Sequence, residues 1–132
     1  MTSKDYVKIF KESGALLEGH FVLTSGRHSP SYFQCAKVLQ NSKYLKLFSD
    51  QIADHFNNSQ IDTIVSPAVG GIVIGTAVGI SMNKPAIFAE RENGRMTFRR
   101  GFSIEEGESI LIIEDVVTTG GSVKEVIQLV ES

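Results

Sequence analysis

The chain has 132 residues, of which 42% are hydrophobic and 21% are charged, and its formal net charge is −2. This length suits a single domain, and the slight acidity argues against the basic surface of a nucleic-acid-binding protein. The first residues, MTSKDYVKIF, are polar and mixed, and no apolar run reaches the roughly 18 residues of a membrane span. We therefore expect a cytoplasmic protein that binds neither nucleic acid nor membranes.

The first part of the chain predicts two amphipathic helices joined by strands and loops. Apolar residues on one face predict a helix over 4–13. A second helix is predicted over 42–56, where apolar residues recur at three- and four-residue steps. Between them, GHFVLTSGRHSPSYFQ at 19–34 combines glycine, proline and aromatic residues, a mixture typical of short strands and loops.

Three short apolar runs follow, and none shows the alternation of a half-exposed strand: IDTIVS at 61–66, PAIFA at 85–89 and SILII at 109–113. They predict buried parallel strands. Helices are predicted over 70–82 and 122–130. This order predicts an α/β fold with a doubly wound, mostly parallel sheet. The Asn93-Gly94 pair predicts a projecting hairpin or mobile loop between the second and third strands.

Two glycine-bearing loops leave the carboxyl ends of these strands, where sheets of this class bind their ligands. Residues 66–71 lead into a helix, so backbone N–H groups and the helix dipole can face an anion there. Residues 118–122, TTGGS, can fold around a phosphate in the same way. Neither loop fits GxxxxGK[ST] or GxGxxG, which argues against the usual triphosphate- and dinucleotide-binding sites.

Glu114 and Asp115 stand directly before the second loop. Adjacent carboxylates repel a phosphate unless they hold something neutral or cationic, such as vicinal sugar hydroxyls or a magnesium shell. A phosphorylated ribose meets this requirement, with its hydroxyls on the two acids and its 5′-phosphate on 118–122. For either acid alone, a helix cap or a simple strand end is the competing interpretation.

The stretch IEDVVTTGGS at 113–122 resembles the phosphoribosyl-pyrophosphate signature of type I phosphoribosyltransferases. Residues 19–34 are similar to the hood of orotate phosphoribosyltransferases, and residues 88–102 to the catalytic-loop region of one bacterial branch of that family. The resemblance implies the type I phosphoribosyltransferase fold in a single domain over 1–132. We expect a small hood over about 1–40 and a core over about 41–132 that lacks its carboxyl-terminal part.

The resemblance also implies the reaction. Ribose 5-phosphate passes reversibly from phosphoribosyl pyrophosphate to orotate, giving orotidine 5′-phosphate and pyrophosphate in pyrimidine synthesis, with Mg²⁺ as cofactor. The expected assembly is a homodimer with shared active sites, in which the 92–100 loop of one subunit closes over the site of the other. The turn over 68–70 is expected to contain a strained or cis non-proline peptide bond, as the family's pyrophosphate loops commonly do.

Family roles carry over to matching positions. Arg91 is expected to bind pyrophosphate, and Glu114 and Asp115 to hold the ribose hydroxyls. No residue is expected to bind the metal directly; the substrate holds Mg²⁺, and Asp115 reaches it through water. The expected substrate-binding residues come from the two loops, the hairpin and the hood: Ala68, Val69, Gly70, Gly71, Arg95, Arg99, Val116, Val117, Thr118, Thr119, Gly120, Gly121, Ser122, Thr24, Tyr32 and Phe33.

Other interpretations stay open. A purine-type phosphoribosyltransferase would share the phosphate loops but lack the hood pattern. A non-catalytic regulator that binds phosphoribosyl pyrophosphate on the same fold would usually add a basic nucleic-acid-binding surface. Tyr32 and Phe33 also suit core aromatics. The better-known branch of the resembled family carries lysine where this chain has Thr24 and Gly70, so phosphate neutralisation is weaker at both positions.

Overall fold

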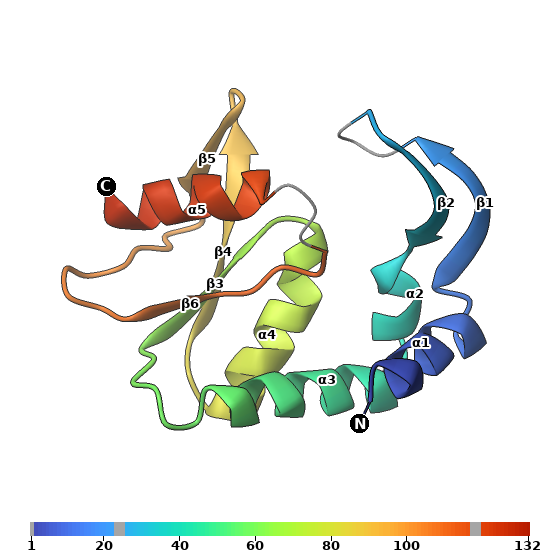
Figure 1. The fold of residues 1–132 in the computed structure, drawn as a ribbon. Coiled ribbons are helices and arrows are strands. Elements are labelled where there is room, and N and C mark those ends of the chain that lie inside the picture. The colour runs from blue at the N-terminus through green and yellow to red at the C-terminus, as the bar shows by residue number, and fades with distance from the viewer. Residues whose placement is uncertain (1, 23–25, 117–119) are drawn as a thin grey trace. The chain divides into compact units, whose positions relative to one another are not determined.

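The computed structural model describes residues 2–22, 26–116 and 120–132 (Figure 1). The chain divides into two compact units, residues 1–45 and 46–132. The expected division of a single domain near residue 40 stays a prediction. Within the described ranges, no helix is both long and apolar enough to cross a membrane.

The first unit contains helices and a small antiparallel sheet. Helix α1 (Ser3–Glu12) begins with a capping box: the Thr2 side chain accepts from the Asp5 N–H, and the Asp5 carboxylate accepts from the Thr2 N–H. Strands β1 (Leu16–Val22) and β2 (His28–Phe33) pair antiparallel. Helix α2 (Cys35–Leu39) was not predicted, because five residues are too few to show a helical period. Helix α3 (Ser42–His55) follows near its predicted bounds, and from residue 46 onward it belongs to the second unit.

The second unit is built on a sheet with the strand order β5-β4-β3-β6. Its strands are β3 (Thr63–Pro67), β4 (Ala86–Glu92), β5 (Arg95–Phe98) and β6 (Ile110–Ile112). Strand β3 is buried throughout and pairs parallel with both β4 and β6, which confirms the three predicted parallel strands. Strand β5 pairs antiparallel with β4 through Asn93 and Gly94, whose φ angles are 53° and 77°. This turn confirms the predicted hairpin.

Helices α4 (Gly70–Met82) and α5 (Gly121–Glu131) cover opposite faces of the sheet. Consecutive residues of a strand point to opposite faces. On β3, Ser66 lies against Gly75 of α4, whereas Val65 belongs to a core cluster with Val126 of α5. The arrangement is therefore the predicted doubly wound α/β fold, with its core on both sides of β3 (Figure 1).

Glycines set how closely α4 approaches the sheet. A Cβ atom on Gly75 would collide with the Ser66 side chain, and one on Gly79 would lie 2.8 Å from the Cβ atom of Ala86. On Gly71, it would lie 3.1 Å from the carbonyl oxygen of Ile113. The helix backbone thus rests directly on the strands at three successive turns.

The structure corrects one predicted boundary. Strand β4 was expected over 85–89, with Arg91 just beyond its end. The strand runs to Glu92, and Arg91 lies within it, opposite Met96 of β5. Pairing with β5 explains the extension, because the hairpin partner continues the ladder past the apolar run that marked the strand in the sequence.

Candidate active site

The turn between β3 and α4 forms one wall of the candidate site. The Ala68–Val69 peptide bond is cis, as predicted. The Ala68 N–H donates to the Ala89 carbonyl at 2.8 Å, which ties the turn to β4. Val69 is the N-cap residue of α4 and makes no side-chain capping bond, unlike Thr2 at the start of α1. Since valine offers no acceptor, N–H groups at the start of α4 can serve an anion instead.

The acid pair lies beside this turn. The Ile113 N–H donates to the Val65 carbonyl at 3.0 Å, so the chain follows β3 until Glu114 and Asp115 emerge at the edge of the sheet. Both are half-buried. A Cβ atom on Gly70 would lie 2.9 Å from each carboxylate oxygen of Asp115. The predicted pyrophosphate turn and the predicted ribose-binding acid are therefore in direct contact, and Gly70 leaves the space that Asp115 occupies.

Burial disfavours the charged form of Glu114. Its Oε1 atom accepts a hydrogen bond from the Asp115 backbone N–H at 3.1 Å. Burial raises the pKa of Glu114 to about 7, and the neighbouring Asp115 carboxylate acts in the same direction, against the smaller opposing effect of the backbone hydrogen bond. Burial therefore makes this carboxyl group easier to protonate than an ordinary glutamate. A cation or hydroxyl donors beside it would favour ionisation.

Arg91 is held by an acid that the sequence did not indicate. Its Nη1 and Nη2 atoms donate to Oε2 and Oε1 of Glu125 at 2.5 and 2.8 Å, which joins β4 to α5. The Glu125 contact raises the pKa of Arg91, first through these hydrogen bonds and then through charge. Glu125 lies 34 positions from Arg91 in the sequence, and no local pattern connects the two.

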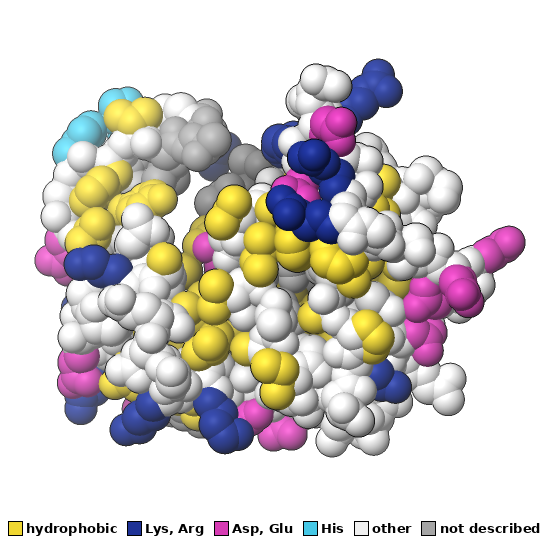
Figure 2. Space-filling model, turned by 180° about the vertical axis from the view of Figure 1, so that it is seen from behind, with side chains coloured by type: hydrophobic (Ala, Val, Ile, Leu, Met, Phe, Trp, Pro, Cys, Tyr) yellow, Lys and Arg dark blue, Asp and Glu magenta, His cyan; other side chains and the backbone are white. Residues whose placement is uncertain are grey.

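Three further arginines, Arg95, Arg99 and Arg100, lie on the hairpin or directly after it. Arg100 donates to both carboxylate oxygens of Glu90 at 2.8 and 3.0 Å and stands over the Phe88 ring. Arg99 forms an ion pair with Glu92 at 3.3 Å, and Arg95 is exposed where β5 begins. Figure 2 shows basic and acidic side chains together on this projecting part of the unit. The hairpin is therefore a surface of mixed charge.

Only part of the second predicted phosphate loop is described. Val116, partly exposed, follows the acids. Gly120 caps α5 in the left-handed region with φ 79°, and Gly121 and Ser122 form the first turn of that helix. Val117, Thr118 and Thr119 lie outside the described residues, as does Thr24. Their expected contacts with the substrate stay predictions.

The hood aromatics pack within the first unit. Phe33 meets the ring of Phe10 edge-on, with centroids 5.4 Å apart. Tyr32 lies 5.8 Å from Phe21, centroid to centroid. Tyr32 and Phe33 still keep 39% and 42% of their surface exposed. Each ring therefore combines internal packing with a free face, and the expected role as a wall for the base stays a prediction.

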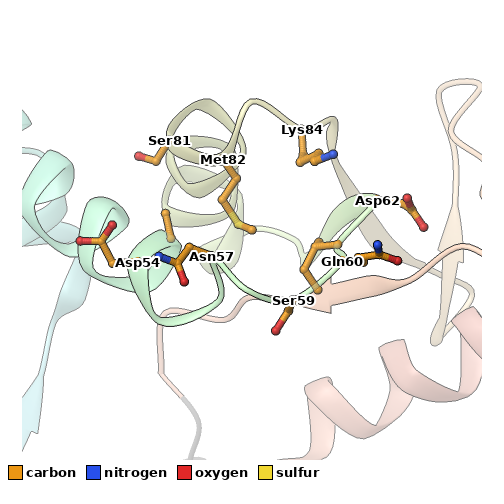
Figure 3. Close-up of a pocket in the computed structure, with 10 residues that line it drawn as sticks. Asp54, Asn57, Ser59, Gln60, Asp62, Ser81, Met82 and Lys84 are labelled. Atoms are coloured by element: carbon orange, nitrogen blue, oxygen red, sulfur yellow. The ribbon is translucent and has the colours of Figure 1, made fainter.

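A hollow lies at the opposite edge of the sheet, where β3 and β4 begin (Figure 3). It has a volume of about 700 Å³, and Asp54 and Asp62 lie at opposite ends of it. The Asp62 carboxylate already accepts the Ser109 N–H at 2.8 Å. Ligands of doubly wound sheets bind at the carboxyl ends of the strands, so this hollow is not the candidate site.

The acid pair also fits what Mg²⁺ requires of a protein. In the described part of the chain, no group of three or more His, Cys, Asp or Glu side chains could hold a metal ion. Magnesium typically keeps several waters and binds through one or two carboxylates together with substrate phosphates. Glu114 and Asp115, next to an anion-binding turn, provide such a pair.

Comparisons with known proteins identify the family of the chain. The model of the phosphoribosyl transferase domain family matches residues 36–132. The orotate phosphoribosyltransferase of Chlorobium phaeobacteroides is 57% identical over 132 residues, which are 100% of this chain and 68% of that protein. The orotate phosphoribosyltransferase of Chlorobaculum parvum is 58% identical over the same shares of the two chains.

Solved structures share the fold. The UMP synthase of Leishmania donovani superimposes with a TM-score of 0.81 and 25% identity, covering 97% of this chain and 28% of that chain. The adenine phosphoribosyl transferase of Trypanosoma brucei has a TM-score of 0.72 and 21% identity, covering 99% of this chain and 64% of that chain. Because an adenine enzyme shares the fold, the sequence relatives decide between branches. The chain belongs to the orotate phosphoribosyltransferases of the phosphoribosyltransferase family.

Proposed function

We propose that the acid pair and the β3–α4 turn transfer ribose 5-phosphate from phosphoribosyl pyrophosphate to orotate. The observation that carries this assignment is the contact between Asp115 and Gly70, since it brings a sugar-binding acid next to a pyrophosphate-binding turn. Family membership supports the same reaction.

As the bond from C1′ to pyrophosphate breaks, negative charge grows on the leaving oxygens and positive charge on the ribose. Fixed charges and dipoles aimed at these centres lower the barrier. On the pyrophosphate side, Arg91 and the amides of Val69 to Gly71 receive the leaving group. Arg95 and Arg99 of the hairpin add positive charge to it when the 92–100 segment closes over the site.

On the ribose side, Glu114 and Asp115 accept hydrogen bonds from the sugar hydroxyls. The 5′-phosphate binds to the segment 118–122, at the start of α5. Asp115 would contact substrate-held Mg²⁺ through water, and the ion would supply positive charge for the leaving pyrophosphate. The raised pKa of Glu114 fits this role, because hydroxyl donors or a cation favour the charged form of its carboxyl group.

Assays with different bases test which base the enzyme accepts. We expect turnover with orotate and phosphoribosyl pyrophosphate, and none with adenine or hypoxanthine in place of orotate. Product formation with a purine base would favour the purine-type alternative. Tight binding of phosphoribosyl pyrophosphate without turnover of any base would favour a regulator on the same fold.

We also propose a homodimer in which the 92–100 segment of each subunit completes the other's site. The composition of helix α4 supports the homodimer, since residues 70–82 include no charged side chain. Ile80 and Val73 on this helix are 77% and 50% exposed. Exposed apolar surface of this kind suits a partner subunit, and two-fold pairing is the commonest assembly. A cytoplasmic location stays a prediction.

Subunit mixing tests the shared site. An Arg99→Ala, Arg100→Ala variant and an Asp115→Asn variant should each have little activity. After mixing, random reassortment makes half of the dimers mixed, each with one intact site, which restores up to about a quarter of the wild-type sites. Lack of recovery between variants shown to exchange subunits would contradict the shared site.

A further inference from the structure

The ion pair between Arg91 and Glu125 occupies the fork formed by Nη1 and Nη2, one of the two guanidinium forks on which a pyrophosphate group could bind. Both terminal nitrogens of the Arg91 guanidinium donate to the Glu125 carboxylate, at 2.5 and 2.8 Å. The planar guanidinium fork matches carboxylate and phosphate oxygens in the same two-bond geometry. One pair of N–H groups cannot serve both acceptors in that geometry.

We infer that Glu125 competes with pyrophosphate for Arg91, so that the leaving group displaces the Glu125 carboxylate when it binds and the carboxylate returns when it leaves. This inference rests on the proposed pyrophosphate-binding role of Arg91. The competition is the same whether Arg91 serves a site in its own subunit or in a partner.

The exposure of the pair makes such an exchange feasible. The side chain of Arg91 is 49% exposed and that of Glu125 35% exposed, so water reaches both charges. Exposed ion pairs contribute little net stability, because water solvates the separated charges well. A diphosphate brings more negative charge to Arg91 than one carboxylate does. Pyrophosphate therefore displaces the Glu125 carboxylate from Arg91, and the displacement slightly lowers the affinity for pyrophosphate.

The exchange has a consequence for turnover. If Arg91 binds the ground state and the transition state equally strongly, Glu125 weakens both to the same extent. The rate of the chemical step then does not change. Lower affinity for pyrophosphate does speed the departure of the product, and product release limits the turnover of many enzymes. Glu125 thus prevents pyrophosphate from remaining on Arg91 after transfer.

A double-mutant cycle isolates the competition. Binding of inorganic pyrophosphate with Mg²⁺ is measured by calorimetry for the wild type, Glu125→Gln, Arg91→Ala and the double variant. Glu125→Gln should tighten binding about two- to five-fold, the equivalent of an exposed ion pair. Arg91→Ala should weaken it at least about ten-fold, since it removes charged hydrogen bonds. In the Arg91→Ala background, Glu125→Gln should have no effect.

Glu131→Gln is the matched control, because it removes the same charge from the far end of the same helix. It should leave pyrophosphate binding unchanged. In steady-state assays, Glu125→Gln should lower KM for phosphoribosyl pyrophosphate and strengthen product inhibition by pyrophosphate by similar factors, without raising kcat. A purely structural role would move the unfolding midpoint but not these two constants together.

The outcomes separate the inference from the function on which it rests. If Arg91→Ala weakens binding but Glu125→Gln leaves it unchanged or weakens it, Glu125 does not compete, and the role of Arg91 survives. Tightening that persists without Arg91, or that Glu131→Gln reproduces, would reduce the effect to general charge and overturn the inference. If Arg91→Ala leaves pyrophosphate binding unchanged, the proposed role of Arg91 fails, and the inference fails with it.

Discussion

Two glutamates, one on β4 and one just after β6, respond to their surroundings in opposite ways. Glu90 of β4 accepts two hydrogen bonds from Arg100, and this contact lowers its pKa. Glu114, just after β6, lies beside another acid, and burial raises its pKa to about 7. The Glu90 carboxylate is therefore stabilised in its charged form by Arg100, whereas the charged form of Glu114 is disfavoured by burial.

The contrast between Glu90 and Glu114 indicates which of the two acids a bound ligand would stabilise. An acid already paired with arginine on the surface gains little from a further partner. An acid that burial drives toward its neutral form gains from any hydroxyl donor or cation that stabilises its charge. We therefore propose that the ligand binds at the end of β6, whereas Glu90 and Glu92 are already paired with Arg100 and Arg99.

The largest expected effect comes from Asp115→Asn. The substitution keeps the size of the side chain against Gly70 but removes the charge that we propose faces the ribose. Loss of an aligned electrostatic contact in a transition state costs on the order of 10²–10³-fold in turnover. Assays of orotate-dependent turnover should show this loss while the unfolding midpoint stays near that of the wild type.

Asp54→Asn provides the matched control for that variant, since Asp54 lies in the hollow at the opposite edge of the sheet. It should retain wild-type turnover. If Asp115→Asn folds normally and also turns over at nearly the wild-type rate, the ribose site has been assigned to the wrong end of the sheet.

Gly70→Ala should separate activity from stability. The new methyl group would lie 2.9 Å from the Asp115 carboxylate, which is the movable end of a side chain and can shift. Because displacement of a catalytic group by about 1 Å can cost up to 10²-fold, we expect about a ten-fold loss of kcat/KM with little change in stability.

Gly75→Ala should behave in the opposite way, because its methyl group meets the buried Ser66 side chain. Overpacking costs about 1–3 kcal/mol, which exceeds the gain in helix propensity of up to about 1 kcal/mol. Chemical denaturation measures both variants. Equal losses of stability in the two would mean that Asp115 cannot move away from residue 70.

The pH dependence of stability tests the raised pKa of Glu114. The folded protein holds this proton up to about pH 7, whereas an ordinary glutamate loses it near pH 4.5. Stability from this group is therefore fully present below about pH 4.5 and falls as the pH rises through about 7. The difference in unfolding free energy between the wild type and Glu114→Gln, measured from pH 5 to pH 8, should follow this fall. A difference that is constant with pH would contradict it.

The smallest effect is expected from Glu90→Gln, the counterpart of Glu114→Gln on the paired side. Arg100 loses a charged partner but remains solvated, as exposed arginines usually are. Turnover should stay within about two-fold of the wild type, and the stability difference should not rise or fall through pH 7. A pH dependence like that of Glu114→Gln would remove the distinction between the two acids.

Local patterns in the sequence predicted much of this molecule. Continuous apolar runs gave the parallel strands, and Asn93-Gly94 predicted the hairpin because both residues adopt positive φ easily. The acids and the glycine turns were predicted as a site because each follows a strand, and carboxyl ends of parallel strands meet at one edge.

The contacts between those segments were not predictable in the same way. That Asp115 touches Gly70 depends on β6 lying next to β3, and that Glu125 reaches Arg91 depends on α5 covering the sheet face near β4. Neither neighbour relation is encoded in a local pattern. Helix α2 was missed for a different reason, since it is shorter than two turns.

The glycines of α4 have a mechanical consequence. With Gly71, Gly75 and Gly79 placing the helix backbone directly on the strands, no layer of side chains is available to slide or repack between them. The β3–α4 turn is therefore a fixed platform, and any closure around the substrates has to come from another segment. The β4–β5 hairpin suits that part, because it projects from the sheet (Figure 1). The β3–α4 turn would then stay fixed during turnover, and the β4–β5 hairpin would move.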